Sequence, residues 1–386
     1  MSIVREGIEP HGGVCLPAQT RIIELGPKPT KHFDAAIVGG GPAGSGCAAF
    51  CASAGLRTLL LERENFPREK VCGDCLNPGC WPILRRLDLG ERVRALPAGV
   101  LNRVEFIGVG GRTLAVTLPT AEIAIKRSLF DQLLMTRARE LGAIVFESTT
   151  VTALSAPDNG NGHWTIVAGE KTFEARMLVA ADGRNSTVAR LCGLLPRSEK
   201  ERIALQTHLP LPADFGDRIV LQFLPEGYSG QAPVGRGELN LCLVSVPRKM
   251  AALRIWAEAR FGISPEHSWR TITPLTRAPI SAGQRSLFLV GDAARVVEPF
   301  TGEGIYYALA SGELAADAIV SQCNGRGVDE VSAADSTAHA ELYRGRLWIN
   351  RLARAAVLSP RVASAFLEVA RFQPAILRLL TAKIVR

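Results

Sequence analysis

The chain has 386 residues, of which 47% are hydrophobic and 21% are charged. This composition excludes a disordered chain and is sufficient for the cores of two domains. Basic residues exceed acidic residues by 45 to 37, and the excess gathers at the C-terminus, where residues 341–386 hold nine Lys or Arg and two acids. The rest of the chain is therefore almost neutral.

Cysteine usage and the N-terminus indicate a reducing, cytoplasmic location. The nine cysteines are odd in number and lie within apolar patterns, unlike a dense disulfide framework. Residues 1–32 mix charged residues with Pro and Gly and contain no apolar run of the kind found in a signal peptide. Residues 35–56 carry no charge, but their six glycines argue against a membrane span.

The uncharged stretch has the pattern of a strand, a glycine turn and a helix. Gly39, Gly41 and Gly44 stand in GxGxxG spacing between an apolar run and a run of small residues. The first glycine permits the tight turn, the second lets a pyrophosphate approach the backbone, and the third allows helix and strand to pack closely. The N-terminus of the helix then faces the phosphate charge.

An acidic residue follows at the position that such a unit requires. The next apolar run, residues 57–61, ends at Glu62, which can accept hydrogen bonds from a ribose diol. A GxGxxG turn alone is a weak signal because glycine-rich turns occur for many reasons. With strand, helix and terminal acid in register, the segment predicts dinucleotide binding rather than a structural turn.

Two further acids stand at the ends of strand-like runs. Residues 171–181 are expected to form a strand, paired in a hairpin with residues 164–168, and they lead into Asp182 and Gly183. Gly291 and Asp292 follow another apolar run. Open α/β sheets bind ligands at the carboxyl ends of their strands, so both carboxylates can face one site. Either acid alone could be no more than a helix N-cap. Their order after GxGxxG and Glu62 favours a ligand role.

This order of motifs resembles the FAD-binding core of the aromatic hydroxylase and geranylgeranyl reductase superfamily, over segments scattered between residues 33 and 323. The resemblance implies FAD as cofactor and an α/β (α+β) fold with a Rossmann-like domain of the glutathione reductase or p-hydroxybenzoate hydroxylase type. It also implies that Arg63, beside the ribose acid, and Arg127, near the pyrophosphate, bind the cofactor. Arg127 precedes Ser128 and Asp131, which are expected to form a capping box.

Residues 298–307, EPFTGEGIYY, resemble the geranylgeranyl reductase branch of this superfamily. Backbone N–H groups near Gly302 and Gly304, before a helix expected over residues 305–319, could stabilise an anionic reduced flavin. The segment FPREKVCGD at residues 66–74 is similar to the same branch and to flavin-dependent halogenases. The chain has no WxWxIP segment, which disfavours halogenation.

Three roles are open for Cys72, Cys75 and Cys80. Zinc needs four ligands and no second CxxC exists, so no metal is expected. A redox dithiol beside flavin usually accompanies a second GxGxxG for nicotinamide, which is missing. The favoured role leaves Cys72 in a loop over the flavin and the other two as packing residues. The reductant is then NAD(P)H binding transiently, or another protein.

Alternating apolar residues between positions 201 and 275 predict an antiparallel sheet with one covered face. With residues 101–119, this sheet would form the wall of a pocket for a hydrophobic substrate. Reductases of the branch have a YxWxFP segment here, of which Tyr228 and Pro233 remain while Gly230 and Ala232 replace the aromatic residues. An isoprenoid, a quinone and a polyketide-like molecule all stay open as substrates.

No constellation for hydrolysis is visible, and the six histidines are expected at the surface. The chemistry would belong to the flavin, with Cys72, Asp74, Tyr228 and Tyr306 as candidate proton donors. The favoured reaction is reduction of a carbon–carbon double bond. The alternatives are hydroxylation of an aromatic or polyketide-like substrate by a flavin monooxygenase, and a non-catalytic FAD-holding partner in an assembly.

The C-terminal region shows basic amphipathic helices. They are expected to pack on the body, or to touch the inner face of an anionic membrane peripherally. Aromatic residues are too few there to suggest a nucleic-acid partner. The expected division of the chain is an irregular extension at 1–32, an FAD-binding domain at 33–100, 120–200 and 276–325, a substrate domain at 101–119 and 201–275, and the basic helical region at 326–386.

Overall fold

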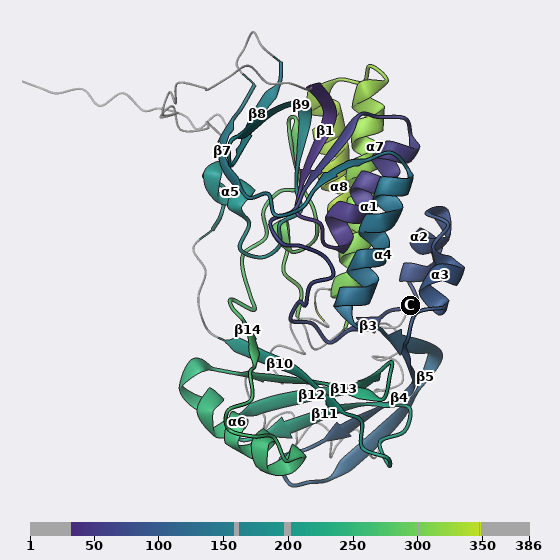
Figure 1. The fold of residues 1–386 in the computed structure, drawn as a ribbon, viewed down its shortest axis with the longest axis vertical. Helices are drawn as coiled ribbons and strands as arrows, with labels where there is room; N and C mark the ends of the chain where they lie inside the picture. Colours follow the sequence, from purple (N-terminus) through teal and green to yellow (C-terminus); the bar gives the residue numbers. More distant parts are fainter. Residues whose placement is uncertain (1–31, 158–161, 197–201, 299–301, 347, 349–386) are drawn as a thin grey trace, which may run out of the picture.

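The computed structural model describes residues 32–157, 162–196, 202–298, 302–346 and 348, which form two sheets with helices packed against them (Figure 1). Residues 1–31 of the expected N-terminal extension, and residues 347 and 349–386 of the basic C-terminal region, lie outside the described residues. Within the described ranges, no helix has the length and apolar character needed to cross a membrane.

The first sheet contains the dinucleotide-binding pattern. Its main path runs β15-β16-β9-β1-β2-β6. The strands are β1 His32–Val38, β2 Thr58–Leu61, β6 Ile144–Phe146, β9 Lys171–Ala180, β15 Gly283–Gln284 and β16 Leu287–Leu289. All neighbours on this path pair in parallel except β15 and β16, as crossover connections through helices require.

A hairpin extends this sheet from β9. Strand β8 (Trp164–Ala168) pairs antiparallel with β9 and with β7 (Val151–Ser155). The predicted hairpin between residues 164–168 and the following strand is therefore confirmed. Figure 1 shows β7, β8 and α5 (Thr187–Leu191) at one side of the sheet, and the long helices at the other.

Four helices cover the second face of the first sheet (Figure 1). They are α1 Pro42–Ser53, α4 Arg127–Glu140, α7 Gly304–Cys323 and α8 Val328–Leu342. Helix α1 contacts both α4 and α7, and its small side chains are almost all buried. Two short helices, α2 (Cys80–Arg86) and α3 (Gly90–Arg94), lie beside this layer. The predicted α/β fold is confirmed.

The second sheet has the order β14-β10-β13-β12-β11-β4-β5-β3. Its strands are β3 Cys75–Leu76, β4 Gly99–Ile107, β5 Thr113–Ala124, β10 Ile203–Pro210, β11 Arg218–Leu224, β12 Gly227–Val234, β13 Glu238–Ser245 and β14 Arg270–Ile272. Strands β4 and β11 pair in parallel, so the sheet is mixed rather than purely antiparallel. Strand β5 also continues past the expected boundary at residue 119.

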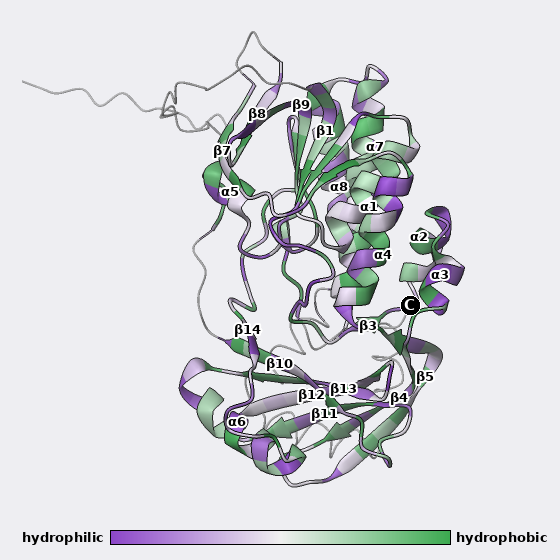
Figure 2. Cartoon of the chain, in the orientation of Figure 1, coloured by the Kyte–Doolittle hydropathy of each residue, from purple (hydrophilic) through white to green (hydrophobic). Residues whose placement is uncertain are grey.

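Helix α6 (Pro247–Phe261), which the alternating pattern did not indicate, covers the outer face of the second sheet (Figure 1). Leu241 and Leu243 of β13 pack in one cluster with Leu253 of this helix. The expectation that only one face of this sheet is covered is therefore wrong, because apolar side chains are buried on both faces. Figure 2 shows hydrophilic residues on parts of α6 and hydrophobic residues along the central strands of the first sheet.

The start of α4 differs from the predicted capping box. The helix begins at Arg127, its N-cap is Lys126, and no side chain caps it. Asp131 instead accepts two hydrogen bonds from the Arg127 guanidinium, each 2.7 Å long. A buried arginine needs a carboxylate partner, and this requirement outweighs the gain from a helix cap.

Candidate functional site

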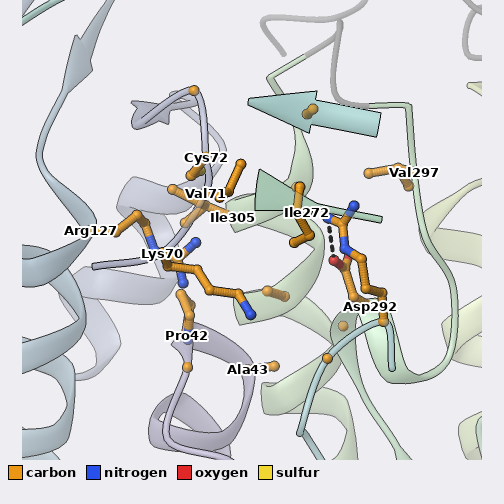
Figure 3. Close-up of a pocket in the computed structure, with 18 of the residues that line it drawn as sticks. Pro42, Ala43, Lys70, Val71, Cys72, Arg127, Ile272, Asp292, Val297 and Ile305 are labelled. Carbon is orange, nitrogen blue, oxygen red and sulfur yellow. Dashed lines mark hydrogen bonds and ion pairs between the residues drawn. The ribbon is translucent and has the colours of Figure 1, made fainter. Parts of the chain in front are cut away.

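A cavity of about 600 Å³ lies between the two sheets (Figure 3). At the first-sheet end it is lined by the β1–α1 turn and by the residues that follow β2, β9 and β16. At the second-sheet end it is lined by side chains of β4, β5, β11, β12 and β13. The loop of residues 68–75 passes along the cavity between these ends.

The glycine turn has the geometry that its spacing predicts. Gly39 has φ +107°, and a Cβ on Gly44 would lie 1.9 Å from the Gly39 oxygen. A Cβ on Gly41 would meet no atom nearer than Arg68 Nη2, at 3.7 Å. Gly39 and Gly44 thus serve the turn and the helix packing, while Gly41 leaves its space to the cavity. That space, at the N-terminus of α1, can accept a phosphate.

Glu62 lies at the end of β2 with 5% of its surface exposed. Its Oε2 accepts a hydrogen bond of 2.6 Å from Gly40 N, and its Oε1 accepts one of 2.9 Å from Glu64 N. The backbone therefore fixes the carboxylate at the cavity wall, and each oxygen keeps a lone pair for a ribose hydroxyl. Arg63 lies at the exposed rim and pairs with Glu64 at 3.4 Å.

Asp182 supports the start of α5 with one carboxylate oxygen and leaves the other without a partner, although the N-cap of that helix is Ser186. Its Oδ2 accepts hydrogen bonds from the backbone N–H groups of Thr187 at 2.6 Å and Val188 at 3.1 Å, at the start of α5. Its Oδ1 is buried and has no hydrogen-bond partner among the described residues. Burial raises the pKa of Asp182. An orphaned oxygen at the cavity wall can accept from a ligand hydroxyl.

Asp292 follows β16 and also lines the cavity (Figure 3). Its Oδ2 forms an ion pair of 2.9 Å with Arg184 Nη2, which holds the carboxylate at the cavity wall. The remaining predicted glycines, which carry no side chain that could intrude, line the same space: Gly183, Gly291, Gly302 and Gly304. Of these, Gly291 has φ +55° and donates its N–H to Ser311 Oγ at 2.8 Å.

Arginine and lysine side chains surround the space above the glycine turn. Arg127 is 9% exposed and reaches the cavity from the start of α4. Asp131, fully buried, pairs with Arg127 and, at 3.0 Å, with Arg68. Because the carboxylate is shared between two guanidinium groups, part of their charge remains to attract an anion from the cavity.

The sequence analysis missed Lys70, which extends into the cavity between Arg127 and Asp292 (Figure 3). Burial, together with the nearby Arg127 and Arg68, lowers the pKa of Lys70 to about 8. No ion pair holds its ammonium within the described residues. Lys70 lies within the FPREKVCGD motif, so the signal was present but was not attributed to this residue.

Asp74 lies behind the cavity lining and not in it. Its Oδ2 accepts a hydrogen bond of 2.7 Å from Asn240 Nδ2 and contacts His208 Nε2 at 2.8 Å. Asn240 Nδ2 also donates to the Cys72 oxygen at 2.8 Å. Burial raises the pKa of Asp74, whereas the His208 hydrogen bond lowers it. This buried network fixes the Cys72 loop on β10 and β13.

The expectation that all histidines are at the surface is wrong. His208 is buried against Asp74, and His339 of α8 is 6% exposed. Burial lowers the pKa of His339 to about 4, with a further contribution from Arg295. A sequence shows neither the distant carboxylate that contacts His208 nor the packing that buries His339, so neither position could be recognised from spacing.

Three thiols, those of Cys72, Cys75 and Cys242, line the cavity. All are free, and Cys80 is fully buried as a packing residue. Burial raises the pKa of Cys72, so the thiol keeps its proton at neutral pH although Arg127 opposes the shift. No group of three or more metal-ligating side chains occurs in the described part of the chain.

The two candidate tyrosines differ in position. Tyr228 of β12 is 3% exposed and lines the cavity, and burial raises its pKa well above the ordinary value. Tyr306 of α7 does not line it. Its ring lies beside Gly79, and the Arg346 guanidinium carbon is 5.6 Å from the ring centroid. Only Tyr228 is therefore placed to touch a molecule in the cavity.

The second-sheet end of the cavity is largely apolar. Its apolar lining consists of Val104, Phe106, Leu118, Ala204, Ile219, Leu221, Ala232 and Val244. On β13, Asn240 and Cys242 alternate with Leu239, Leu241 and Leu243, and it is Asn240 and Cys242 that face this space. The predicted wall is present, but on β13 the leucines turn away from it, because periodicity does not tell which face of a strand turns toward the cavity.

These features fit FAD. The space left by Gly41 at the N-terminus of α1 accepts a diphosphate, and Arg127 and Lys70 supply positive charge beside it. Glu62 and the orphaned Asp182 oxygen are acceptors for the hydroxyl groups of the ribose and ribityl chains.

Residues 32–215 match the family described as FAD binding domain. A menaquinone reductase from Mycolicibacterium smegmatis is 30% identical over 358 residues, which are 83% of this chain and 83% of that protein. The chain belongs to this family of FAD-dependent oxidoreductases. The resemblance to the geranylgeranyl reductases and the FAD prediction are thereby confirmed.

Two further comparisons describe the breadth of this FAD-dependent family. A chloroplastic geranylgeranyl diphosphate reductase from Oryza sativa subsp. japonica is 32% identical over 335 residues, covering 78% of this chain and 70% of that protein. The solved structure of a flavin-dependent brominase variant has a TM-score of 0.75 at 21% identity, covering 92% of this chain and 95% of that one. The fold is thus shared by reductases and halogenating enzymes.

Proposed function

We propose that this FAD-dependent oxidoreductase reduces a carbon–carbon double bond of an apolar, isoprenoid-bearing substrate. The apolar lining of the second-sheet end supports the proposal, because it would take an aliphatic chain out of water next to the cofactor. The two named reductase relatives support it as well, since menaquinone and geranylgeranyl diphosphate both carry polyprenyl chains.

Bound FAD would supply the two-electron chemistry, with NAD(P)H as its transient reductant. The chain's own residues would bind and orient the cofactor and the substrate. The glycine turn and Arg127 would hold the diphosphate, while Glu62 and Asp182 would hold hydroxyl groups. The apolar wall would exclude water from the reacting carbons. Cys72 and Tyr228, which keep their protons, would donate hydrogen bonds to the substrate.

Anaerobic turnover tests this function. The FAD-loaded protein is reduced with dithionite or NADPH under nitrogen and mixed with geranylgeranyl diphosphate. We expect a product heavier by two hydrogen atoms for each reduced bond, detected by mass spectrometry and formed without oxygen. Failure to form it under nitrogen, with an oxygenated product in air, would contradict the proposal.

A flavin monooxygenase is the second candidate, and the shape of the cavity favours it in one respect. Gly230 and Ala232 line the cavity where reductases of the branch carry aromatic residues. A Cβ on Gly230 would have only Leu221 near it, at 3.7 Å. The extra room would suit a ring system. Dependence of the product on oxygen, measured in the same experiment, decides between the two candidates.

A membrane is the proposed source of the substrate. An isoprenoid-bearing molecule partitions into lipid, and the nine basic residues of region 341–386 would attract the chain to an anionic surface. We therefore propose peripheral membrane contact through this region.

A further inference from the structure

Glu122 is a buried carboxyl group in the cavity wall that no motif indicated. It stands near the end of β5, is 7% exposed, and lines the cavity. Leu101 of β4 is its direct cross-strand partner. Leu101 and Leu118 belong to one apolar cluster beneath the cavity. The carboxyl group is therefore set in an apolar wall at the end of the cavity that would receive the substrate.

No cation neutralises Glu122 within the described residues. Arg346 does not pair with Glu122, because its guanidinium forms an ion pair of 2.7 Å with Glu303. The other groups that face Glu122 are Cys75 on β3 and Cys80 on α2, and burial raises the pKa of both thiols, which stay neutral. An isolated buried carboxylate is costly, so the group is stable in its neutral form.

Burial raises the pKa of Glu122 to about 7, and repulsion from Glu303 contributes to the shift. A pKa near the working pH is the most effective one for a general acid. The thiol of Cys72 and the phenol of Tyr228 hold their protons more tightly, because burial raises both pKa values above their already higher ordinary ranges. Of these three cavity residues, Glu122 gives up its proton most readily.

We propose that Glu122 is the general acid that protonates the substrate, an assignment that rests on the proposed function. The double bond would gain a hydride from the reduced cofactor at one carbon and the Glu122 proton at the other. The π bond, the Glu122 O–H bond and the bond between the cofactor and the transferred hydride would break, and two C–H bonds would form. The hydride would bring both electrons, and the Glu122 carboxylate would then regain a proton from water.

The test compares E122Q with E105Q in anaerobic single turnovers of the reduced holoenzyme. Glutamine keeps the size and hydrogen bonding of Glu122 but cannot release a proton. Glu105 lies on neighbouring β4, pairs with Arg218 at 3.1 Å, and does not line the cavity. Its replacement therefore removes a carboxylate from the same sheet without touching the site.

For the wild type, we expect a rate that is constant below about pH 7 and falls about tenfold per pH unit above it. E122Q should be slower by a factor of about 10² to 10⁴ and should lack this dependence, with FAD affinity unchanged. E105Q should keep the wild-type profile. An E122Q rate and pH profile equal to those of the wild type would overturn the assignment.

Infrared difference spectra of the holoenzyme give a second readout that needs no substrate. The spectrum of the wild type minus that of E122Q should show a carboxylic-acid C=O band that titrates with a midpoint near pH 7; burial raises the pKa of Asp335 to about 7 as well, but its band is common to both proteins and cancels. A band that shows only carboxylate at about pH 5 would refute the acid role. If the wild type itself reduces no isoprenoid substrate, the proposed function fails and the assignment falls with it. If the wild type forms product and E122Q forms it equally fast, only the assignment of Glu122 is refuted and the proposed function stands.

Discussion

At the residue scale, we expect Lys70 to couple cofactor binding to pH. Its ammonium lies above Pro42 and Ala43 at the N-terminus of α1, between Arg127 and Asp292 (Figure 3). Burial and the neighbouring guanidinium groups lower the pKa of Lys70 to about 8. A bound diphosphate would reverse this shift, because it stabilises the charged form.

We expect FAD affinity to be full below about pH 8 and to fall as the pH rises, since binding must then take up a proton at Lys70. K70M should weaken binding by a factor of about 10 to 100, equivalent to the loss of a charged hydrogen bond, and should remove this pH dependence. Titration of the apo-protein measures the affinity through quenching of flavin fluorescence. K126M removes a lysine that pairs with Glu238 outside the cavity, and it should behave as wild type. Equal affinities of K70M and wild type would contradict the role.

At the scale of elements, α1 must pack closely against the turn between β1 and α1 for the cofactor-binding edge of the first sheet to form. A Cβ on Gly44 would lie 1.9 Å from the Gly39 oxygen and 2.9 Å from Ala181 Cβ. Neither neighbour can move easily, because both belong to buried backbone turns. The same helix contains Gly46, where a Cβ would meet only Leu309 Cδ2, at 3.5 Å.

We expect Gly44→Ala to destabilise the protein by about 3 kcal/mol or more through overpacking. Gly46→Ala, on the same helix, should be neutral or stabilising by up to about 1 kcal/mol, because alanine favours the helix. Urea unfolding of the two apo-variants measures the difference. Similar midpoints for both variants would show that the close contact at Gly44 can be relieved.

At the scale of the whole molecule, one buried ion pair connects the two sheets. Arg202, just before β10, donates hydrogen bonds of 3.0 Å and 2.7 Å to the Glu298 carboxylate, which follows the first sheet's last strand. Their side chains are 1% and 3% exposed. Removing one partner would leave a charge buried between the sheets without its counterion.

Arg202→Met should therefore lower the free energy of unfolding by about 3 to 5 kcal/mol, whereas the double variant with Glu298→Leu should recover most of this loss. Urea unfolding followed by far-UV circular dichroism provides the comparison. A single variant no less stable than the double variant would mean that the charge of Glu298 is neutralised by other groups.

The basic C-terminal region gives a second prediction at this scale. Deleting the chain after Pro374 removes three basic residues, Arg378, Lys383 and Arg386. We expect weaker binding to anionic liposomes and unchanged FAD content, because all the residues assigned to the cofactor site precede residue 309 in the chain. Co-sedimentation at low and high salt measures the binding, with neutral liposomes as the control. If the truncated protein sediments with the liposomes as the full chain does, these three basic residues do not serve membrane contact.

The features that the sequence determined by itself are those whose parts are adjacent in the chain. Gly39, Gly41 and Gly44 stand in one turn, Glu62 ends the next strand, and the hairpin before Asp182 is continuous, so local periodicity and spacing were enough to predict them. That these residues lie at one site could be predicted because the carboxyl ends of parallel strands lie at the same edge of a sheet.

Only the tertiary structure decided which distant residues meet. Asp74 and His208 are 134 positions apart, and Arg202 and Glu298 are 96 apart, so no local pattern relates them. The same holds for Glu122, whose acidity depends on an apolar wall contributed by other strands. Burial and charge neutralisation are properties of packing, and they therefore appear only when the two sheets are brought together around the cavity.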